Sequence, residues 1–357
     1  MQKTFKYLLI AVIAGFAISF AVMLGVGLEN IWQVLKQTNY LYMGIALGFT
    51  MLSVIATNLR WRVVVNDAGI KISGLKLFLI SLSGIAFSNL TPSARFGGEP
   101  IRAYFINKHA KVHTRSSLAT IVTEKVFDAA IFCLISIIAI GIAVKQMAVP
   151  VWALGLVFLS LLMILSLMIL AIYISIKPDA GRRMMRWFLR KFSFAVKSEK
   201  TKDKILRDMV EYSENMAKLL RRKSLWLKGA LFSLLIWLCD VARIYFIFLA
   251  LGFAVDPSTI LVVLIISLLA GTLPLLPGGL GIMEPVMIII YNSSGITLVA
   301  AGMATIIDRL FSFWLLTILG LGATSYLGLK LGKGADIDGG NGKGKNKGLE
   351  GRKMRCD

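Results

Sequence analysis

The stretch LTPSARFGGEP, residues 90–100, interrupts an otherwise apolar region that runs over residues 72–108. A second apolar region, residues 258–294, is interrupted in the same way by LPLLPGGLGIMEP at residues 273–285. Proline lacks an amide donor and clashes with the turn before it, so a continuous helix cannot pass through either stretch. We therefore predict that both regions are helices broken near their middle.

Six other segments are long and apolar enough to cross a bilayer, whose hydrocarbon layer of about 30 Å needs about 20 helical residues. The chain has 357 residues, of which 57% are hydrophobic and 17% charged, and its mean hydropathy is +0.76. This composition excludes a soluble globular, disordered or nucleic-acid-binding protein, and in lipid only helices satisfy their own backbone groups. The predicted spans are residues 7–28, 40–59, 117–144, 149–176, 229–252 and 297–328.

The distribution of basic residues predicts the orientation of the chain. Basic residues outnumber acidic ones by 16 to 6 within residues 177–228 and by 8 to 4 from residue 330 onward. Such loops stay on the cytoplasmic side, so we expect a plasma-membrane protein with both termini in the cytoplasm. By the same rule the region 72–108 has both flanks inside, whereas the region 258–294 begins and ends outside. Each is therefore predicted to be re-entrant, from opposite faces.

An internal repeat links the two broken regions. Glu99-Pro100 is followed 25 residues after the glutamate by EKVF, and Glu284-Pro285 is followed after 24 residues by DRLF. With the opposite orientations, this pattern predicts an all-α polytopic membrane protein of two inverted-topology repeats, with six full spans plus two re-entrant broken-helix hairpins. Transporters of this design place their site near the midplane, where the repeats meet.

The chain divides into four predicted parts. They are an N-terminal membrane half (1–176), a basic cytoplasmic connector with an amphipathic helix (177–228), a C-terminal membrane half (229–328) and a flexible basic tail (329–357).

The Gly-Gly turns and the Glu-Pro pairs are candidates for binding a lipid headgroup. We expect Glu99 and Glu284 to cap half-helices, whose partly positive amide ends receive a phosphate while the carboxylates meet an ammonium or a proton. Alternatively, each glutamate only caps its helix and the glycines only permit a turn. The candidate headgroup-binding residues are Gly97, Gly98, Glu99, Arg102, Gly278, Gly279 and Glu284.

Charged residues within the predicted spans are candidates for coupling or gating. A charge inside the bilayer is costly, so each is expected to have a partner or water, and carboxylates there are expected to couple transport to protons. Ion pairs that only hold helices together are the alternative, above all for Asp240 and Arg243, which have no counterpart in the repeat. The set comprises Glu124, Lys125, Asp128, Asp308, Arg309, Asp240 and Arg243.

Other polar side chains give weaker evidence for a binding site. Arg95 and Arg102 flank the first Gly-Gly and are suited to clamp a phosphate, although a salt bridge from Arg102 to Glu99 is the alternative. His109 and His113 lack nearby carboxylates or cysteines, and the three cysteines have no paired spacing. No nucleotide-binding glycine motif occurs. We therefore predict neither a metal site nor a cofactor.

The stretches GGEPIRAY (97–104), TEKVFD (123–128) and LPGGLG (276–281), with Glu284, resemble the lysylphosphatidylglycerol synthase transmembrane-region family of integral membrane proteins. The resemblance implies a lipid-translocating module. In bacterial multiple-peptide-resistance proteins this module is the flippase half beside a domain that aminoacylates phosphatidylglycerol. Archaeal relatives are joined to glycosyltransferases that act on dolichol-linked sugars. Neither partner domain follows here, so the resemblance leaves the cargo open.

Three functions fit the sequence. We expect a flippase that moves a charged or phosphorylated headgroup between leaflets, with anionic or zwitterionic membrane lipids as partners and no catalysis. A membrane-embedded enzyme of phospholipid aminoacylation or polyprenyl-phosphate glycan synthesis, with Glu99 or Asp128 as base, is one alternative. The other is a scaffold that recruits a separate lipid-modifying synthase or glycosyltransferase. The sequence does not predict the oligomeric state.

Overall fold

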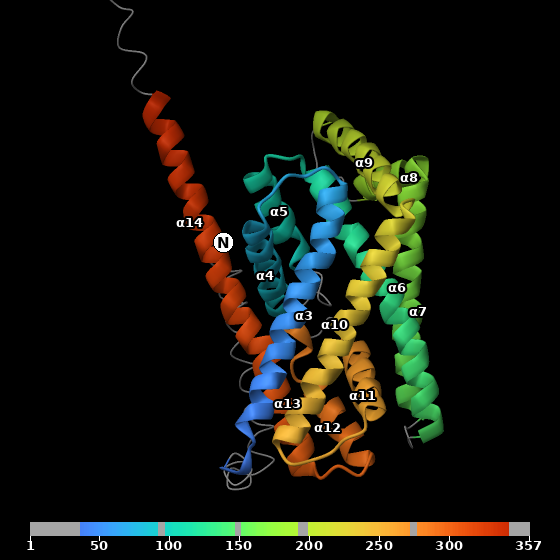
Figure 1. Ribbon diagram of the computed structural model, residues 1–357. Helices are drawn as coiled ribbons and strands as arrows, with labels where there is room; N and C mark the ends of the chain where they lie inside the picture. The colour runs from blue at the N-terminus through green and yellow to red at the C-terminus, as the bar shows by residue number, and fades with distance from the viewer. Residues whose placement is uncertain (1–35, 92–96, 147–150, 192–198, 272–276, 343–357) are drawn as a thin grey trace, which may run out of the picture.

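The computed structural model describes residues 36–91, 97–146, 151–191, 199–271 and 277–342 (Figure 1). The predicted span 7–28, Arg95 and the end of the predicted tail lie outside these residues. Within the described ranges every regular element is a helix. They are α3 (Tyr40–Asp67), α4 (Gly74–Leu90), α5 (Glu99–Ala110), α6 (Thr114–Gln146), α7 (Val151–Ile176), α8 (Pro178–Lys191), α9 (Glu199–Leu220), α10 (Lys223–Ala250), α11 (Pro257–Ala270), a 3-10 turn (Pro277–Gly279), α12 (Met283–Ser293), α13 (Leu298–Arg309), a π-helix (Leu310–Leu315) and α14 (Leu316–Gly342).

Four of the predicted spans coincide with helical segments long and apolar enough to cross a membrane. These segments are Tyr40–Asp67, Thr114–Lys145, Lys223–Ala250 and Leu298–Leu329. The predicted span 149–176 falls on α7, whose apolar stretch Phe158–Ile174 is shorter. Apolar composition along whole helices therefore predicts these elements well, because lipid forces the backbone to satisfy itself within each segment.

Both predicted interruptions separate pairs of helices. α4 ends at Leu90 and α5 begins at Glu99, while α11 ends at Ala270 and α12 begins at Met283. Each pair packs together, α4 on α5 and α11 on α12. Figure 1 shows α4 and α5 toward the end of the molecule that carries α8 and α9, and α11 and α12 toward the opposite end. The proline and glycine clusters thus break the chain where the sequence indicated.

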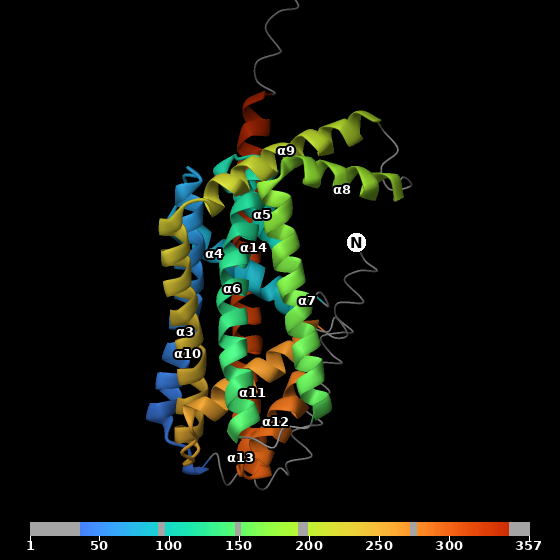
Figure 2. The same cartoon turned by 90° about the vertical axis from the view of Figure 1, so that its right-hand side faces the viewer.

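The helices α3 and α10 form an extensively packed antiparallel pair along one side of the molecule (Figure 2). The Asn39 amide, just before α3, donates a hydrogen bond of 2.8 Å to the carbonyl of Ala250 at the end of α10, so the two helices run in opposite directions (Figures 1 and 2). The side chain of Asn39 also caps α3 by accepting from the amide of Leu41. The largest apolar core lies beside this pair, between α6, α10, α11, α12 and α13.

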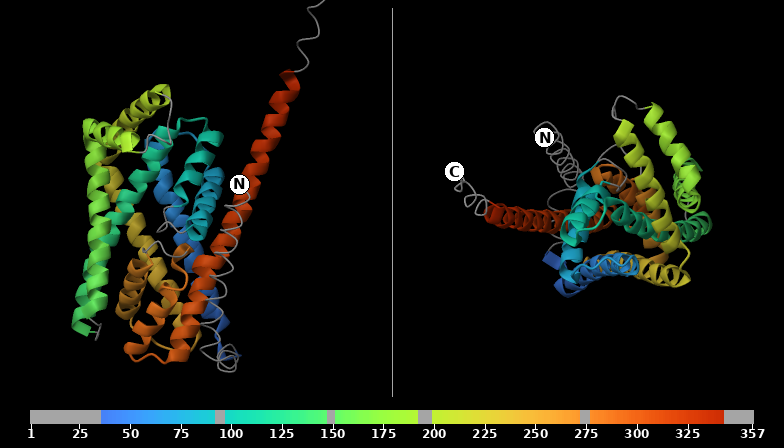
Figure 3. Two further views of the ribbon diagram at one scale, coloured as in Figure 1. Left: turned by 180° about the vertical axis from the view of Figure 1, so that it is seen from behind. Right: turned by 90° about the horizontal axis from the view of Figure 1, so that it is seen from above.

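Close helix packing depends on glycine at two places. A Cβ on Gly98, just before α5, would lie 2.0 Å from the carbonyl oxygen of Gly84 on α4. A Cβ on Gly320 of α14 would lie 2.3 Å from the carbonyl oxygen of Leu82 on α4. Beyond its contact with α4, α14 projects away from the other helices (Figure 3).

The predicted connector contains two helices, α8 and α9, where one amphipathic helix was expected. They lie across one end of the bundle (Figure 2). Met216 and Leu219 of α9 are buried, and Arg115 at the start of α6 pairs with Asp208 at 2.5 Å and with Glu211 at 2.7 Å. The connector is therefore packed onto the membrane helices through α6.

Replacement of Gly320 by alanine is expected to lower the free energy of unfolding by about 1–3 kcal/mol, because the new methyl group overlaps the backbone of α4. Gly322 on the same helix has open space where a Cβ would lie, so Gly322→Ala is the matched control and is expected to be neutral or slightly stabilising. Thermal unfolding of the purified protein in detergent measures both. Equal stability of the two variants would contradict the close approach.

Candidate functional site

Arg60 on α3 is the centre of a buried group of charges in the first half of the chain. Its Nε and Nη2 donate to one oxygen of Glu124 on α6 at 3.0 and 2.6 Å, and its Nη1 pairs with Asp128 one turn further. The other oxygen of Glu124 accepts from Arg102 on α5 at 2.9 Å. Arg60 is only 4% exposed and Glu124 only 1%. We call Arg60, Glu99, Arg102, Glu124, Lys125 and Asp128 the N-terminal charge network.

Arg243 on α10 has the same position in the second half. It donates from Nε to Asp308 on α13 at 2.8 Å and from Nη1 to Asp240 on its own helix at 2.6 Å. Arg243 and Asp308 are 5% and 3% exposed. Removing such ions from water is costly unless each has a partner, and here each has one. We call Asp240, Arg243, Glu284, Asp308 and Arg309 the C-terminal charge network.

The glutamates of the two Glu-Pro pairs each face a cation. Glu99 lies 3.1 Å from Lys125 and Glu284 lies 3.0 Å from Arg309. Each glutamate stands in the first turn of its helix, one or two residues after the cap, so the expectation that they are the caps themselves is corrected. Glu284 also reaches back, because its second carboxylate oxygen accepts from the amide of Gly281 at 2.7 Å.

The two networks share a pattern of spacing along the chain. Arg60 precedes its partner Glu124 by 64 residues, and Arg243 precedes its partner Asp308 by 65. The cation follows the acid directly in both halves, as Lys125 and Arg309. The expectation that Arg243 has no counterpart in the repeat is therefore wrong, since Arg60 is its counterpart. The near-equal separation of each arginine from its acidic partner is the feature of the sequence that relates Arg60 to Arg243, once the ion pairs are known.

Each network also receives a serine from the other half of the chain. Arg60 donates to Ser233 of α10 at 2.8 Å, and Ser53 of α3 donates to Asp240 at 3.1 Å. Neither serine was singled out from the sequence, because nothing in its neighbours marks it. The antiparallel pair of α3 and α10 thus links the two networks through these hydroxyl groups.

A cavity of about 290 Å³ lies between the networks. It is lined by hydroxyl side chains of α3, α4 and the π-helix, by apolar residues of α10, α11 and α12, and by charged residues of both networks. Its charged lining residues are Arg60, Glu99, Arg102, Glu124, Lys125, Asp128, Asp240, Arg243, Asp308 and Arg309. A cavity with this lining is suited to a polar group that must be kept apart from lipid chains.

The glycines of the two candidate turns are placed beside this cavity rather than among the described residues that line it. Gly98 permits the close approach of α4 and α5. Gly278 and Gly279 adopt positive φ angles of 58° and 72°, which L side chains rarely adopt, and Gly278 packs near the carbonyl of Asn89. These glycines therefore allow the broken helices of the two halves to meet.

Arg102 does not form the salt bridge to Glu99 that was the alternative interpretation of its role. It pairs with Glu124 rather than with Glu99, and its guanidinium lies 3.9 Å from the ring centroid of Trp61. Trp61 follows Arg60 directly and is fully buried. Stacking and an ion pair together hold Arg102 at the edge of the cavity.

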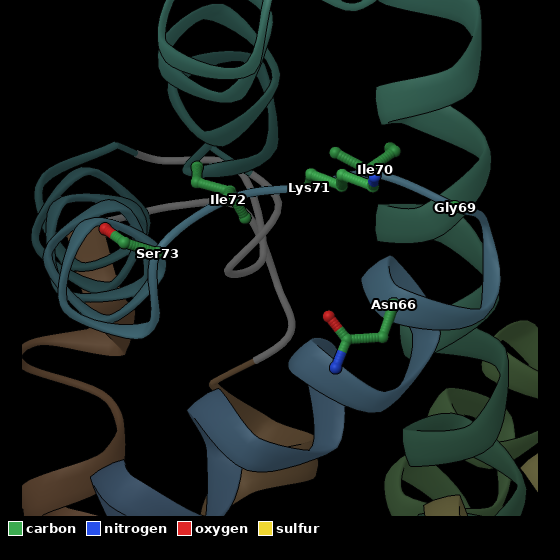
Figure 4. Close-up of a pocket in the computed structure, with 6 residues that line it drawn as sticks. All are labelled: Asn66, Gly69, Ile70, Lys71, Ile72 and Ser73. Carbon is green, nitrogen blue, oxygen red and sulfur yellow. The ribbon is translucent and has the colours of Figure 1, made fainter.

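A second hollow lies outside the charge networks (Figure 4). It has a volume of about 610 Å³ at the end of α3 and the turn into α4. Its lining residues are Asn66, Gly69, Ile70, Lys71, Ile72 and Ser73. It shares no residue with the cavity between the networks, and Lys71 is the one charged residue of this lining. Among the described residues no three His, Cys, Asp or Glu side chains gather closely enough to hold a metal ion.

Apolar helices of spanning length around a charged cavity define this chain as an integral membrane protein. A family model described as "Lysylphosphatidylglycerol synthase TM region" matches residues 7–320, and the chain belongs to this family. A "UPF0104 membrane protein" of Methanothermobacter thermautotrophicus is 32% identical over 89% of this chain and 95% of its own length. Another from Pyrococcus horikoshii is 28% identical over 88% and 95%. "Glycosyltransferase AglD" of Haloferax volcanii is 24% identical over 70% of this chain and 44% of its own length.

Replacement of Arg60 by methionine is expected to lower the free energy of unfolding by about 3 kcal/mol, because the buried Glu124 then keeps only Arg102 as a cation and the partly exposed Asp128 loses its partner. Arg222→Ala is the control: its pair with Asp67 is largely exposed, so a change below about 1 kcal/mol is expected. Chemical or thermal unfolding in detergent compares the two. If Arg60→Met is no less stable than the control, the N-terminal charge network does not hold the helices together.

Proposed function

We propose that this protein is a flippase that moves a charged or phosphorylated lipid headgroup between the two leaflets, without chemical change. The observation that supports it best is the cavity between two corresponding charge networks. Buried ion pairs are costly to assemble and are strongly coupled to whatever enters beside them. A headgroup in the cavity can compete for the same cations and carboxylates, and this competition gives a way to change the packing of the helices.

We propose two inverted-topology repeats as the membrane arrangement, with six full spans and two re-entrant hairpins. Three observations support it. The paired helices α3 and α10 are antiparallel, the hairpin helices of the two halves lie toward opposite ends, and each half has an arginine–carboxylate pair at nearly equal spacing, Arg60–Glu124 and Arg243–Asp308. In this arrangement α8 and α9, with the basic connector, face the cytoplasm of a plasma-membrane protein, as do both termini. The boundaries at residues 176, 228 and 328 then separate the membrane halves from the connector and the tail.

The charged residues have two roles in this proposal. Glu99, Arg102 and Glu284, with the adjacent helix ends, bind the headgroup, while the Arg60 and Arg243 pairs change partners as access alternates. Glu99 and Glu284 are suited to the first role because each is bound by a single cation, so a headgroup needs to displace only one partner. The π-helix that follows Arg309 is an element often found at functional sites, and Ser312 within it lines the cavity.

One observation favours a second candidate function. The similarity to AglD, which is named a glycosyltransferase, is compatible with a membrane-embedded enzyme or a scaffold in lipid-linked glycan synthesis or phospholipid aminoacylation. Either role requires a separate lipid-modifying synthase or glycosyltransferase as partner, or a base such as Glu99 or Asp128. Mass spectrometry of the lipids separates the functions, because an enzyme changes the mass of the lipid, whereas a flippase changes only its leaflet.

The test of the flippase is leaflet exchange of fluorescent anionic and aminoacylated lipids in proteoliposomes that contain the full chain. Glu99→Gln and Glu284→Gln are each expected to slow the exchange at least about tenfold. Each variant removes a carboxylate charge that binds the headgroup once the headgroup has displaced Lys125 from Glu99 or Arg309 from Glu284. Glu214→Gln on the exposed face of α9 makes the same chemical change outside the site and is expected to exchange lipid at the wild-type rate.

One result of the exchange assay would overturn the flippase proposal. If the wild type moves none of these lipids, and the two variants differ from it only in thermal stability, the glutamates serve the ends of α5 and α12 alone. The enzyme or scaffold would then be the function to pursue.

A further inference from the structure

The two charge networks differ in the residue that follows three positions after the glutamate of each Glu-Pro pair. Counting three residues from each glutamate of the Glu-Pro pairs reaches Arg102 in the first half and Met287 in the second. Both side chains line the cavity, and both are buried, at 6% and 1% exposure. Arg102 supplies the second guanidinium to Glu124, whereas methionine supplies no charge at the corresponding place beside Asp308.

This difference leaves the C-terminal charge network short of one cation. The N-terminal charge network has three cations and three carboxylates, whereas the C-terminal one has two cations, Arg243 and Arg309, and three carboxylates. No other charged residue lies among the described residues that line the cavity. A net buried charge is unfavourable in an apolar surrounding, so this network is suited to take up one positive charge from outside.

The position of the surplus charge follows from the contacts of Arg243. This one guanidinium pairs with both Asp308 and Asp240, and Asp240 is the more open of the two, with a side chain 26% exposed against 5%. Asp240 also lines the cavity. In the same network, the buried Oε1 of Glu284 forms its ion pair with Arg309 at 3.0 Å without a hydrogen bond.

Three hydroxyl oxygens of α3 line the same cavity as Asp240 and are free to accept. Thr50, Ser53 and Thr57 lie along one face of α3 and line the cavity. The hydroxyls of Thr50 and Thr57 donate to backbone carbonyls one turn earlier, at 3.0 and 2.9 Å, and that of Ser53 donates to Asp240. Since their hydrogens are used, their oxygen lone pairs remain for a cation, and carboxylate and hydroxyl oxygens are the ligands that hard cations prefer.

We propose that the cavity binds one monovalent cation, a proton or Na⁺, beside Asp240, and that this cation balances the charge for which the other half has Arg102. This inference rests on the proposed function in one respect: the cation is then the ion that is coupled to movement of the headgroup. The other charged groups of the two networks are Arg60 (α3), Glu99 and Arg102 (α5), Glu124, Lys125 and Asp128 (α6), Arg243 (α10), Glu284 (α12), and Asp308 and Arg309 (α13), and the titratable groups next to them are Cys239 (α10) and Tyr291 (α12). The helix α11 contributes none.

Two variants test the site by removing the charge deficit. Asp240→Asn deletes the surplus carboxylate, and Met287→Arg installs the missing cation. The melting temperature of the full-length protein in detergent is measured as Na⁺ replaces choline at constant ionic strength, and separately as pH is lowered at constant Na⁺. For the wild type we expect stabilisation in one of these two series, which identifies the ion, and we expect both variants to lose it. Glu214→Gln is expected to keep the wild-type response.

Leaflet exchange in proteoliposomes provides the second readout. Below saturation, the wild-type exchange rate is expected to change up to about tenfold for a tenfold change in the concentration of the identified ion, and the rate of Asp240→Asn is expected not to change. Asp240→Asn, checked for a monodisperse elution profile, decides the test if Met287→Arg does not fold.

The possible results separate the two proposals. A wild type that responds to neither ion in either assay, or an Asp240→Asn variant that keeps the full response, overturns the cation site. Exchange that depends only on an ammonium in the headgroup also overturns it, because the lipid then supplies the charge. A cation response in detergent without any lipid exchange supports the site and contradicts the flippase, whereas exchange without a cation response supports the flippase and contradicts the site.

Discussion

Two buried arginines, Arg60 and Arg243, impose the main constraint on this structure. A guanidinium inside an apolar bundle is always charged, so carboxylates from other helices must be brought to it. Arg60 requires α6 to lie against α3, and Arg243 requires α13 to lie against α10. The ends of α5 and α12 join the same clusters through their glutamates. The order in which helices pack is thus tied to the pairing of a few charges.

The broken helices follow from this constraint together with close packing. Helices that end within the bundle bring their polar first turns to the charges, and Gly98 and Gly320 let neighbouring backbones approach closely enough to exclude lipid. The remaining space is the cavity between the networks. Its charges come from both halves of the chain, so any group that enters it contacts both halves at once. That geometry is what makes a translocation role physically reasonable for a member of this family.

Several features were predictable because they depend on short-range chemistry. Proline and glycine clusters break helices wherever they occur, and the repeat of Glu-Pro followed by acid-base-aliphatic-Phe marked Lys125 and Arg309 as corresponding residues. Arg60 was not among the candidate site residues, because a lone arginine near the end of a span has no local feature that reveals a buried partner. The partner of Arg102 was also beyond the sequence, since Glu99 was nearer along the chain than Glu124.

The sequence by itself determined that this is a membrane protein, where its helices break and that the Glu-Pro motif occurs twice. Composition, proline placement and spacing carry that information without any contact between distant residues. Only the tertiary structure decided which charges pair, that Arg60 corresponds to Arg243, and that Met287 stands where Arg102 stands in the other half. The physical reason is that an ion pair depends on a separation of a few ångströms in space, and residues 64 positions apart reach that separation only through helix packing.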